Sequence, residues 1–119
     1  MSRSSGRHWE SVAEAWLKHH GCSVIDRNYS CRTGEIDLII RDGAEIAFVE
    51  VKFRGSSSFG RGADHVTRTK QRRIIGAARR FVHYHRHPPS QVFRFDVISI
   101  GDGPAGAEIQ WIKSAFEAV

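Results

Sequence analysis

Residues 34–40, Gly-Glu-Ile-Asp-Leu-Ile-Ile, and residues 48–52, Phe-Val-Glu-Val-Lys, flank a short segment that contains Asp42-Gly43. Two apolar runs around Asp-Gly are the strongest short-range signal of a β-hairpin. Alternate side chains of a strand share a face, so Glu50 and Lys52 point to one side and the valines between and before them to the other. The chain therefore has a central hairpin whose apolar strands carry charged residues.

The length of the turn decides where Asp37 lies relative to Glu50. A two-residue Asp42-Gly43 loop makes the two carboxylates diagonal neighbours, and a four-residue loop makes them direct partners. Only an odd-length loop separates them, because a one-residue slip turns every side chain to the other face. Two carboxylates about 4–5 Å apart repel by roughly 4 kcal/mol at an effective dielectric constant of 20. We therefore expect Asp37, Glu50 and Lys52 on one face at one edge of the sheet, with Lys52 supplying part of the positive charge and a hard divalent cation the rest.

The spacing of these charged residues resembles a known nuclease signature. Asp37, followed on the next strand by Glu50-Val51-Lys52, is similar to the motif of the PD-(D/E)XK nuclease superfamily. Residues 34–39 and 48–54 closely resemble the YraN family of small bacterial proteins. The likeness covers nearly the whole chain, through Ala13, Leu17, Gly21, residues 27–29, Lys70, residues 94–97 and residues 115–116. Cys22 and Ser30 depart from the family pattern, in which an aromatic residue and an arginine are usual.

The resemblance implies a restriction-endonuclease-like fold and metal-dependent hydrolysis of DNA phosphodiester bonds, at branched or damaged DNA as in the similar Holliday-junction resolvases. Asp37, Glu50 and the main-chain carbonyl of Val51 would hold Mg²⁺ or Mn²⁺, which lowers the pKa of a bound water. Lys52 would orient or deprotonate that water. The resemblance also favours Glu10 as an accessory ligand of the metal or the water.

Apolar residues recur at helical spacing between residues 7 and 20, and Gly21 follows them as a helix-ending residue would. Glu10 lies at the border of this apolar stripe and is expected to face the interior. A carboxylate near a helix start is also favoured by the helix dipole alone, without any function. Glu14, further round the helix, is expected to be a solvated charge.

A second helix is predicted from about residue 67 to residue 85. Its apolar residues cluster on one arc, five arginines occupy the opposite arc, and it contains no acidic residue. A helix whose charged residues are all positive favours nucleic-acid contact, although many charged helix faces are merely solvated. The predicted nucleic-acid-binding residues are Lys70, Arg72, Arg73, Arg79, Arg80 and, after the central strand, Arg54. Lys70 falls on the apolar arc, so it is expected to point towards the acidic centre and a bound phosphate.

The remaining elements complete a predicted α/β domain. Strands are expected at residues 23–29, 93–100 and 109–112, a loop at 101–106, and a terminal turn or short helix at 114–119. The Gly/Ser-rich segment 55–62 is either a substrate-gripping loop, with Phe59 as a base-stacking residue, or a plain connector. The order of elements predicts a mixed β-sheet flanked by helices, in one domain spanning residues 1–119.

Composition favours a polyanionic partner. The 119 residues include 18 Lys and Arg against 13 Asp and Glu, a formal charge of +5, which points to nucleic acid, DNA before RNA. The chain shows no secretory signal and no run of membrane-spanning length, so we expect a cytoplasmic protein without a membrane partner. Its two cysteines lack metal-ligand spacing and are expected to be reduced thiols.

Two other functions stay open on the sequence alone. The chain could be a nucleic-acid-binding module without catalysis, or its charged centre could be a structural ion-pair cluster beneath a basic surface. A homodimer would suit a cut in both DNA strands.

Overall fold

The computed structural model describes residues 3–54 and 66–118. The elements follow in the order α1 (Arg3–His19), β1 (Ser23–Cys31), β2 (Gly34–Asp42), β3 (Glu45–Phe53), α2 (Arg68–Tyr84), β4 (Phe93–Gly103) and β5 (Gly106–Phe116). The predicted Gly/Ser-rich loop at residues 55–62, including Phe59, lies outside the described residues. No helix in the described part of the chain is both long and apolar enough to cross a membrane.

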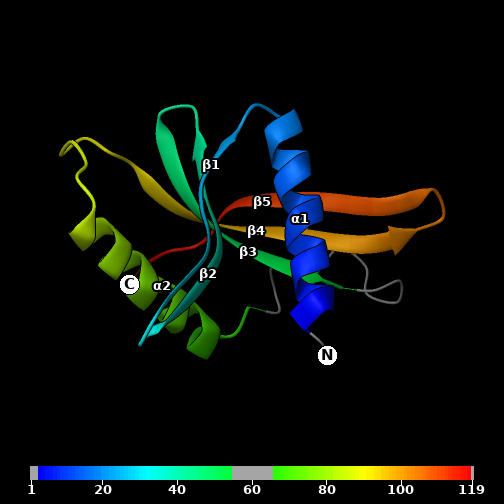
Figure 1. Ribbon diagram of the computed structural model, residues 1–119, viewed down its shortest axis with the longest axis horizontal. Helices are drawn as coiled ribbons and strands as arrows, with labels where there is room; N and C mark the ends of the chain where they lie inside the picture. The colour runs from blue at the N-terminus through cyan, green and yellow to red at the C-terminus, as the bar shows by residue number, and fades with distance from the viewer. Residues whose placement is uncertain (1–2, 55–65, 119) are drawn as a thin grey trace.

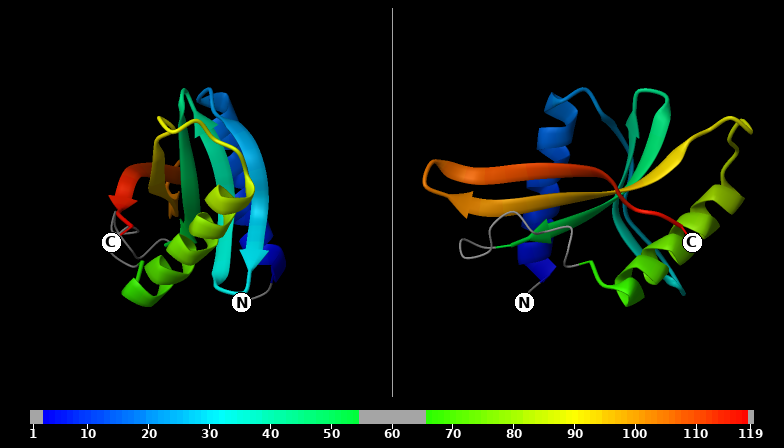
Figure 2. Two further views of the ribbon diagram at one scale, coloured as in Figure 1. Left: turned by 90° about the vertical axis from the view of Figure 1, so that its left-hand side faces the viewer. Right: turned by 180° about the vertical axis from the view of Figure 1, so that it is seen from behind.

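The five strands form one sheet in the order β1-β2-β3-β4-β5. Strands β3 and β4 run parallel, and the other neighbours pair antiparallel. Figures 1 and 2 show α1 crossing one face of the sheet and α2 crossing the other. The fold is therefore the predicted α/β arrangement, a mixed sheet flanked by helices.

Helix α1 ends as the sequence predicts. Gly21 adopts a left-handed φ of 88°, and the N–H groups of Gly21 and Cys22 donate to the carbonyls of Lys18 and Leu17 at 3.1 and 3.0 Å. This pair of hydrogen bonds is a Schellman cap, which glycine forms without a steric penalty because it has no Cβ. The cap turns the chain directly into β1.

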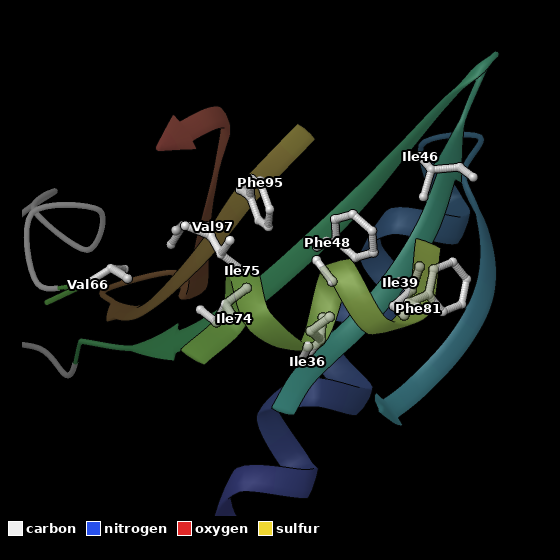
Figure 3. Packing of buried hydrophobic residues seen from close by; sticks show 12 residues of the cluster. Ile36, Ile39, Ile46, Phe48, Val66, Ile74, Ile75, Phe81, Phe95 and Val97 are labelled. Atoms are coloured by element: carbon white, nitrogen blue, oxygen red, sulfur yellow. The ribbon is translucent and has the colours of Figure 1, made fainter. Parts of the chain in front are cut away.

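Each face of the sheet has its own apolar core. Figure 3 shows the α2 cluster, in which Ile74, Ile75 and Phe81 of α2 lie against Phe48 and other apolar side chains of the sheet. The α1 cluster, on the other face, packs Ala13 and Leu17 of α1 against β2, β3 and β4. The α2 cluster contains Ile36, Ile39, Ile46, Phe48, Val66, Ile74, Ile75, Ala77, Ala78, Phe81, Phe95 and Val97; the α1 cluster contains Ala13, Leu17, Cys22, Leu38, Ile40, Ala47, Val49, Ile98 and Ile100. These two layers hold both helices at fixed positions over the central strands.

Three local expectations were wrong. The central turn consists of Gly43-Ala44, because Asp42 pairs with Glu45 and Arg41 with Ile46. Its register is thus that of the longer loop considered above. The loop expected at 101–106 is only Pro104-Ala105, because Gly101 to Gly103 continue β4 and pair with β5. The C-terminal turn or helix is also absent among the described residues, because β5 continues along β4 to Phe116.

Candidate functional site

Asp37 lies where β2 leaves its pairing with β3. Regular pairing ends at Leu38 opposite Val49, and beyond that point Asp37 Oδ2 accepts the N–H of Val51 at 2.8 Å. The carboxylate therefore takes the place of a strand partner. Asp37 lies on an inner strand of the sheet, at the end of this ladder.

Strand β2 changes face at Asp37. Ile36 belongs to the α2 cluster, whereas Leu38 and Ile40 belong to the α1 cluster. On β1, Asn28 adopts a left-handed φ of 51° between the paired residues Arg27 and Tyr29. Simple alternation along β2 therefore fails here. The change of face places Asp37 between the two layers of the fold.

Glu50 is buried beside Asp37 and is contacted by α2. Its side chain is only 8% exposed, and Lys70 Nζ lies 3.3 Å from Glu50 Oε2. The Asp37 and Glu50 side chains hydrogen-bond to each other. The N-cap Thr67, whose hydroxyl accepts the N–H of Lys70 at 3.1 Å, starts α2 so that Lys70 lies in its first turn. The structure thus brings Asp37 and Glu50 together with Lys70, the lysine that was expected to point towards them.

Glu10 approaches the same pair from α1. Its side chain hydrogen-bonds to Asp37 and to Asn28, and a small pocket of about 160 Å³ gives access to it. Sequence reasoning missed Asn28. Its signals were its place in the segment 27–29 that resembles the YraN family and the tolerance of asparagine for the left-handed conformation.

The electrostatics of the three acids follow from their proximity and burial. Burial, followed by the charge of Asp37, raises the pKa of Glu50 to about 8. The same two causes raise the pKa of Glu10 to about 7. Burial also raises the pKa of Asp37, opposed by the N–H of Val51 and by Lys70. At neutral pH the acids therefore share protons unless additional positive charge enters.

Lys52 and Arg54 follow Glu50 at alternate positions of β3. Lys52 is half-buried and pairs across the parallel ladder with Ser99. The Arg54 side chain is 11% exposed, donates to the Ser99 hydroxyl at 3.0 Å and lies 3.7 Å from Glu108. Arg54 is therefore occupied by contacts within the fold, in contrast to the other predicted nucleic-acid-binding arginines.

Helix α2 presents an outer face of exposed arginines. Its buried side is formed by apolar residues, and the exposed arginines are Arg68, Arg72, Arg73, Arg79 and Arg80. Arg80 lies over the Tyr84 ring at 4.9 Å. Within residues 3–54 and 66–118, none of these arginines forms an ion pair, so their charges remain directed to solvent.

Glu14 differs from the sequence expectation. Its side chain is 14% exposed and forms ion pairs with Arg27 of β1 and with Lys18. The hydrogen bond from Arg27 lowers the pKa of Glu14 to about 2. Glu14 therefore links α1 to β1 through an ion pair and is not a solvated charge, because β1 passes close to this side of the helix.

A second charged network lies around the fully buried Asp96. Its carboxylate accepts from Arg94, from the Trp111 indole at 2.9 Å and from the N–H of Ser114 at 3.0 Å. Arg94 also donates to Asp42 and Glu45 beside the central turn, at 2.8 and 2.7 Å. The network joins β2, β3, β4 and β5. Its partners come from four separate segments, which explains why sequence spacing did not reveal it.

A larger pocket lies away from the acids. It has a volume of about 720 Å³ and is lined mainly by apolar residues of α2, β4 and the C-terminal segment, with Arg79 and His83 among its polar residues. A polar pocket of about 290 Å³ instead lies beside Lys70, between the β1–β2 turn and α2.

The donor atoms at Asp37 and Glu50 suit an oxygen-preferring divalent cation. Mg²⁺ in proteins takes one or two carboxylates and retains several waters. The main-chain carbonyl of Val51 faces the same side of β3 as its N–H, which reaches Asp37, and adds a neutral oxygen. In the described ranges no three His, Cys, Asp or Glu side chains lie close enough to hold an ion by themselves. A cation here would therefore keep part of its hydration shell.

Comparisons with known proteins place the chain among small bacterial relatives. The family model described as "Uncharacterised protein family UPF0102" matches residues 9–100. A UPF0102 protein of Aeromonas hydrophila is 47% identical over 115 residues, covering 95% of this chain and 85% of the relative. Relatives from Chromohalobacter salexigens and Nitrosospira multiformis are 44% and 42% identical, covering 98% and 97% of this chain and 94% of each relative.

Proposed function

The chain belongs to the uncharacterised protein family UPF0102, the YraN family that its motifs resemble, and we propose that it is a metal-dependent endonuclease of the PD-(D/E)XK type. The proposed reaction is hydrolysis of a DNA phosphodiester bond, with branched or damaged DNA as the expected substrate. The observation that carries the proposal is the buried Asp37–Glu50 carboxyl pair, which lies against Lys70 of a helix with an arginine-rich outer face.

The carboxyl pair is poised to accept a cation. Burial of two neighbouring carboxyl groups is costly unless a proton or a positive charge lies between them. Lys70 contributes one positive charge, and the raised pKa of Glu50 leaves a proton for a divalent ion to displace. Asp37, Glu50 and the Val51 carbonyl would hold Mg²⁺ or Mn²⁺, which when bound supplies an activated water and stabilises charge on a phosphate.

The other residues would position the reactants. Lys52, which follows Glu50 by two residues on the same face of β3, would orient the attacking water. Glu10, with its pKa near 7, can gain or release a proton close to neutral pH. The arginines on α2 would hold the DNA backbone through charge-assisted hydrogen bonds.

The test is a nicking assay on branched, single-stranded and duplex DNA with Mg²⁺ or Mn²⁺. The native protein is compared with Glu50→Gln and with Glu108→Gln, a matched change at an exposed glutamate. We expect Glu50→Gln to abolish cleavage while DNA binding, measured by fluorescence anisotropy, persists or tightens because one repulsive charge is lost. Glu108→Gln should cleave as the native protein does.

Two results would contradict the proposal. Cleavage that survives Glu50→Gln would place the chemistry elsewhere or in a contaminating nuclease. Failure of the native protein to cut any of the three substrates, with binding intact, would favour a nucleic-acid-binding module without catalysis.

A further inference from the structure

The polar pocket of about 290 Å³ beside Lys70 has two walls. The β1–β2 turn supplies Arg32 and Thr33, and the first half of α2 supplies Lys70 and Arg73. Lys70 also contacts Glu50, so this one side chain links the pocket to the carboxyl pair. A group bound in the pocket would therefore be a close neighbour of a group bound at the acids.

Two glycines keep these walls together. A Cβ at Gly34 would lie 2.4 Å from the main-chain oxygen of Arg73, and a Cβ at Gly76 would lie 2.9 Å from the Thr33 side chain. A side chain at either position would have to displace these atoms, so α2 packs closely against the backbone of Gly34 and the side chain of Thr33. The pocket is consequently formed by the packing of the protein and needs no ligand to assemble it.

The pocket is suited to an anion. Three cationic side chains, Arg32, Lys70 and Arg73, line it against one carboxylate, Glu35. Lys70 shares its charge with Glu50, but Arg32 and Arg73 are exposed and form no ion pair in the part of the chain that the structure describes. Two arginines without an ion pair on the walls of one pocket suit a phosphate, because each guanidinium can donate two parallel hydrogen bonds to phosphate oxygens.

We propose that this pocket holds a backbone phosphate of the DNA strand, adjacent to the scissile phosphate at Asp37 and Glu50. The inference rests on the proposed function and specifies the path of the substrate: the strand runs from the carboxyl pair past Lys70 to the β1–β2 turn. A substrate then needs a second phosphate beside the scissile one. Lys70, located between both positions, contacts the pocket and the acids together.

Cys31 provides a reporter that does not depend on cleavage. It lines the pocket, is partly exposed, and its pKa is lowered mainly by the Thr33 hydroxyl, with Sγ 3.1 Å from Thr33 Oγ1. Cys22, the other cysteine, is buried in the α1 cluster. Alkylation of Cys31 by iodoacetamide, followed by mass spectrometry of its peptide, therefore reports occupancy of the pocket. The reaction is run with a chelator present, so that no divalent ion and no cleavage takes part.

In the native protein we expect inorganic phosphate and a single-stranded oligonucleotide each to slow the alkylation of Cys31. In Arg73→Gln the phosphate concentration that gives half-protection should rise roughly tenfold, the effect of losing one charge-assisted contact. Arg41→Gln, at an exposed position of β2 outside the pocket, should leave it unchanged. An oligonucleotide with one uncharged methylphosphonate linkage beside the scissile position should lose affinity for the native protein but not for Arg73→Gln.

Alkylation that neither probe slows would overturn the proposal. Protection that is equally strong in Arg73→Gln and Arg32→Gln would also overturn it, since a strand could then cover Cys31 without placing a phosphate in the pocket. These outcomes are distinct from failure of the nuclease proposal, which would show as absence of cleavage with the protection of Cys31 retained.

Discussion

Lys70 Nζ lies 3.3 Å from Glu50 Oε2, and this contact joins α2 to the carboxyl pair within the sheet. The ammonium group lowers the pKa of Glu50, against the larger effect of burial, and its own pKa is raised in return by Glu50. The same helix carries the basic outer face. A single element therefore connects the acids to the surface on which a polyanion would lie.

The first prediction concerns this pair. Replacing Lys70 with Met removes the nearest positive charge, so the pKa of the Glu50 carboxyl should rise further above its native value of about 8. Carboxyl carbon shifts in an NMR titration measure the change. Arg72→Met, which removes an equal charge from the exposed face, serves as the control. An unaltered Glu50 titration in Lys70→Met would show that the pair does not persist in solution.

The second prediction is a stability that falls as the pH rises. Glu50 binds its proton more tightly in the folded protein, with a pKa of about 8, than at its ordinary value of 4.5. Folding therefore takes up a proton between these values, and the free energy of unfolding should decrease from about pH 4.5 to pH 8 in the absence of divalent ions. Glu10 adds a smaller change of the same sign, because its pKa rises to about 7.

Thermal unfolding at several pH values measures this dependence. Mg²⁺ or Mn²⁺ should raise the melting temperature at pH 8, close to the pKa of Glu50, where the ion can displace the remaining proton. Removal of the ion by a chelator should reverse the rise. Glu50→Gln should flatten both the pH dependence and the response to the ion. A melting temperature of the native protein that does not change when divalent ions are added at pH 8 would count against the metal site.

The third prediction is a contribution to stability that is lost as the pH falls. Arg27 lowers the pKa of Glu14 to about 2, so this group stabilises the fold above pH 4.5 and the contribution is lost as the pH falls towards 2. Glu14→Gln should cost about 1 kcal/mol at pH 7, a figure kept low because half of the Arg27 side chain is exposed. The exposed Glu117→Gln is the control, and chemical denaturation at pH 7 and pH 3 is the measurement. Equal losses at the two pH values would refute the assignment.

The sequence predicted the elements well because their signals are local. The apolar stripe and Gly21 define α1, and the one-sided arginines with Thr67 define α2. Residues 34–40 and 48–52 do form the central hairpin. The turn residues were misplaced by one position, since Asp42-Gly43 and Gly43-Ala44 both place a glycine where a left-handed conformation is needed.

The site was harder to derive because its geometry depends on tertiary packing. The alternation of side chains along the two strands indicated that Asp37 meets Glu50. The contact, however, arises at a point where β2 changes face and its pairing with β3 ends. That change is matched by the left-handed Asn28 on the neighbouring strand. Likewise, the ion pair of Glu14 with Arg27 joins residues on separate elements. Hydrophobic periodicity carries no information on such pairings.

The fourth prediction concerns Asp96. Its buried carboxylate accepts hydrogen bonds from Arg94, Trp111 and Ser114, so Asp96→Asn would leave the Arg94 charge short of a buried partner. Breaking a buried pair from one side costs about 3–5 kcal/mol. Denaturant unfolding should show a loss of this order for Asp96→Asn and almost none for Asp102→Asn, an exposed position on the same strand. A loss well below 1 kcal/mol in Asp96→Asn would mean that water replaces these contacts.

The last prediction tests the outer face of α2 as a DNA-binding surface. Each cation that contacts a phosphate releases counterions, so the slope of log affinity against log salt measures the number of contacts. Replacing Arg72 and Arg79 with Gln should flatten that slope by roughly one for each lost contact. Lys18 and Arg41, exposed on α1 and β2, provide a matched variant with the same loss of charge. If long-range attraction by the net charge of +5 were the whole effect, both variants would change the slope alike. A flatter slope in the α2 variant alone would assign the contacts to this helix, and an unchanged slope there would remove it from the interface.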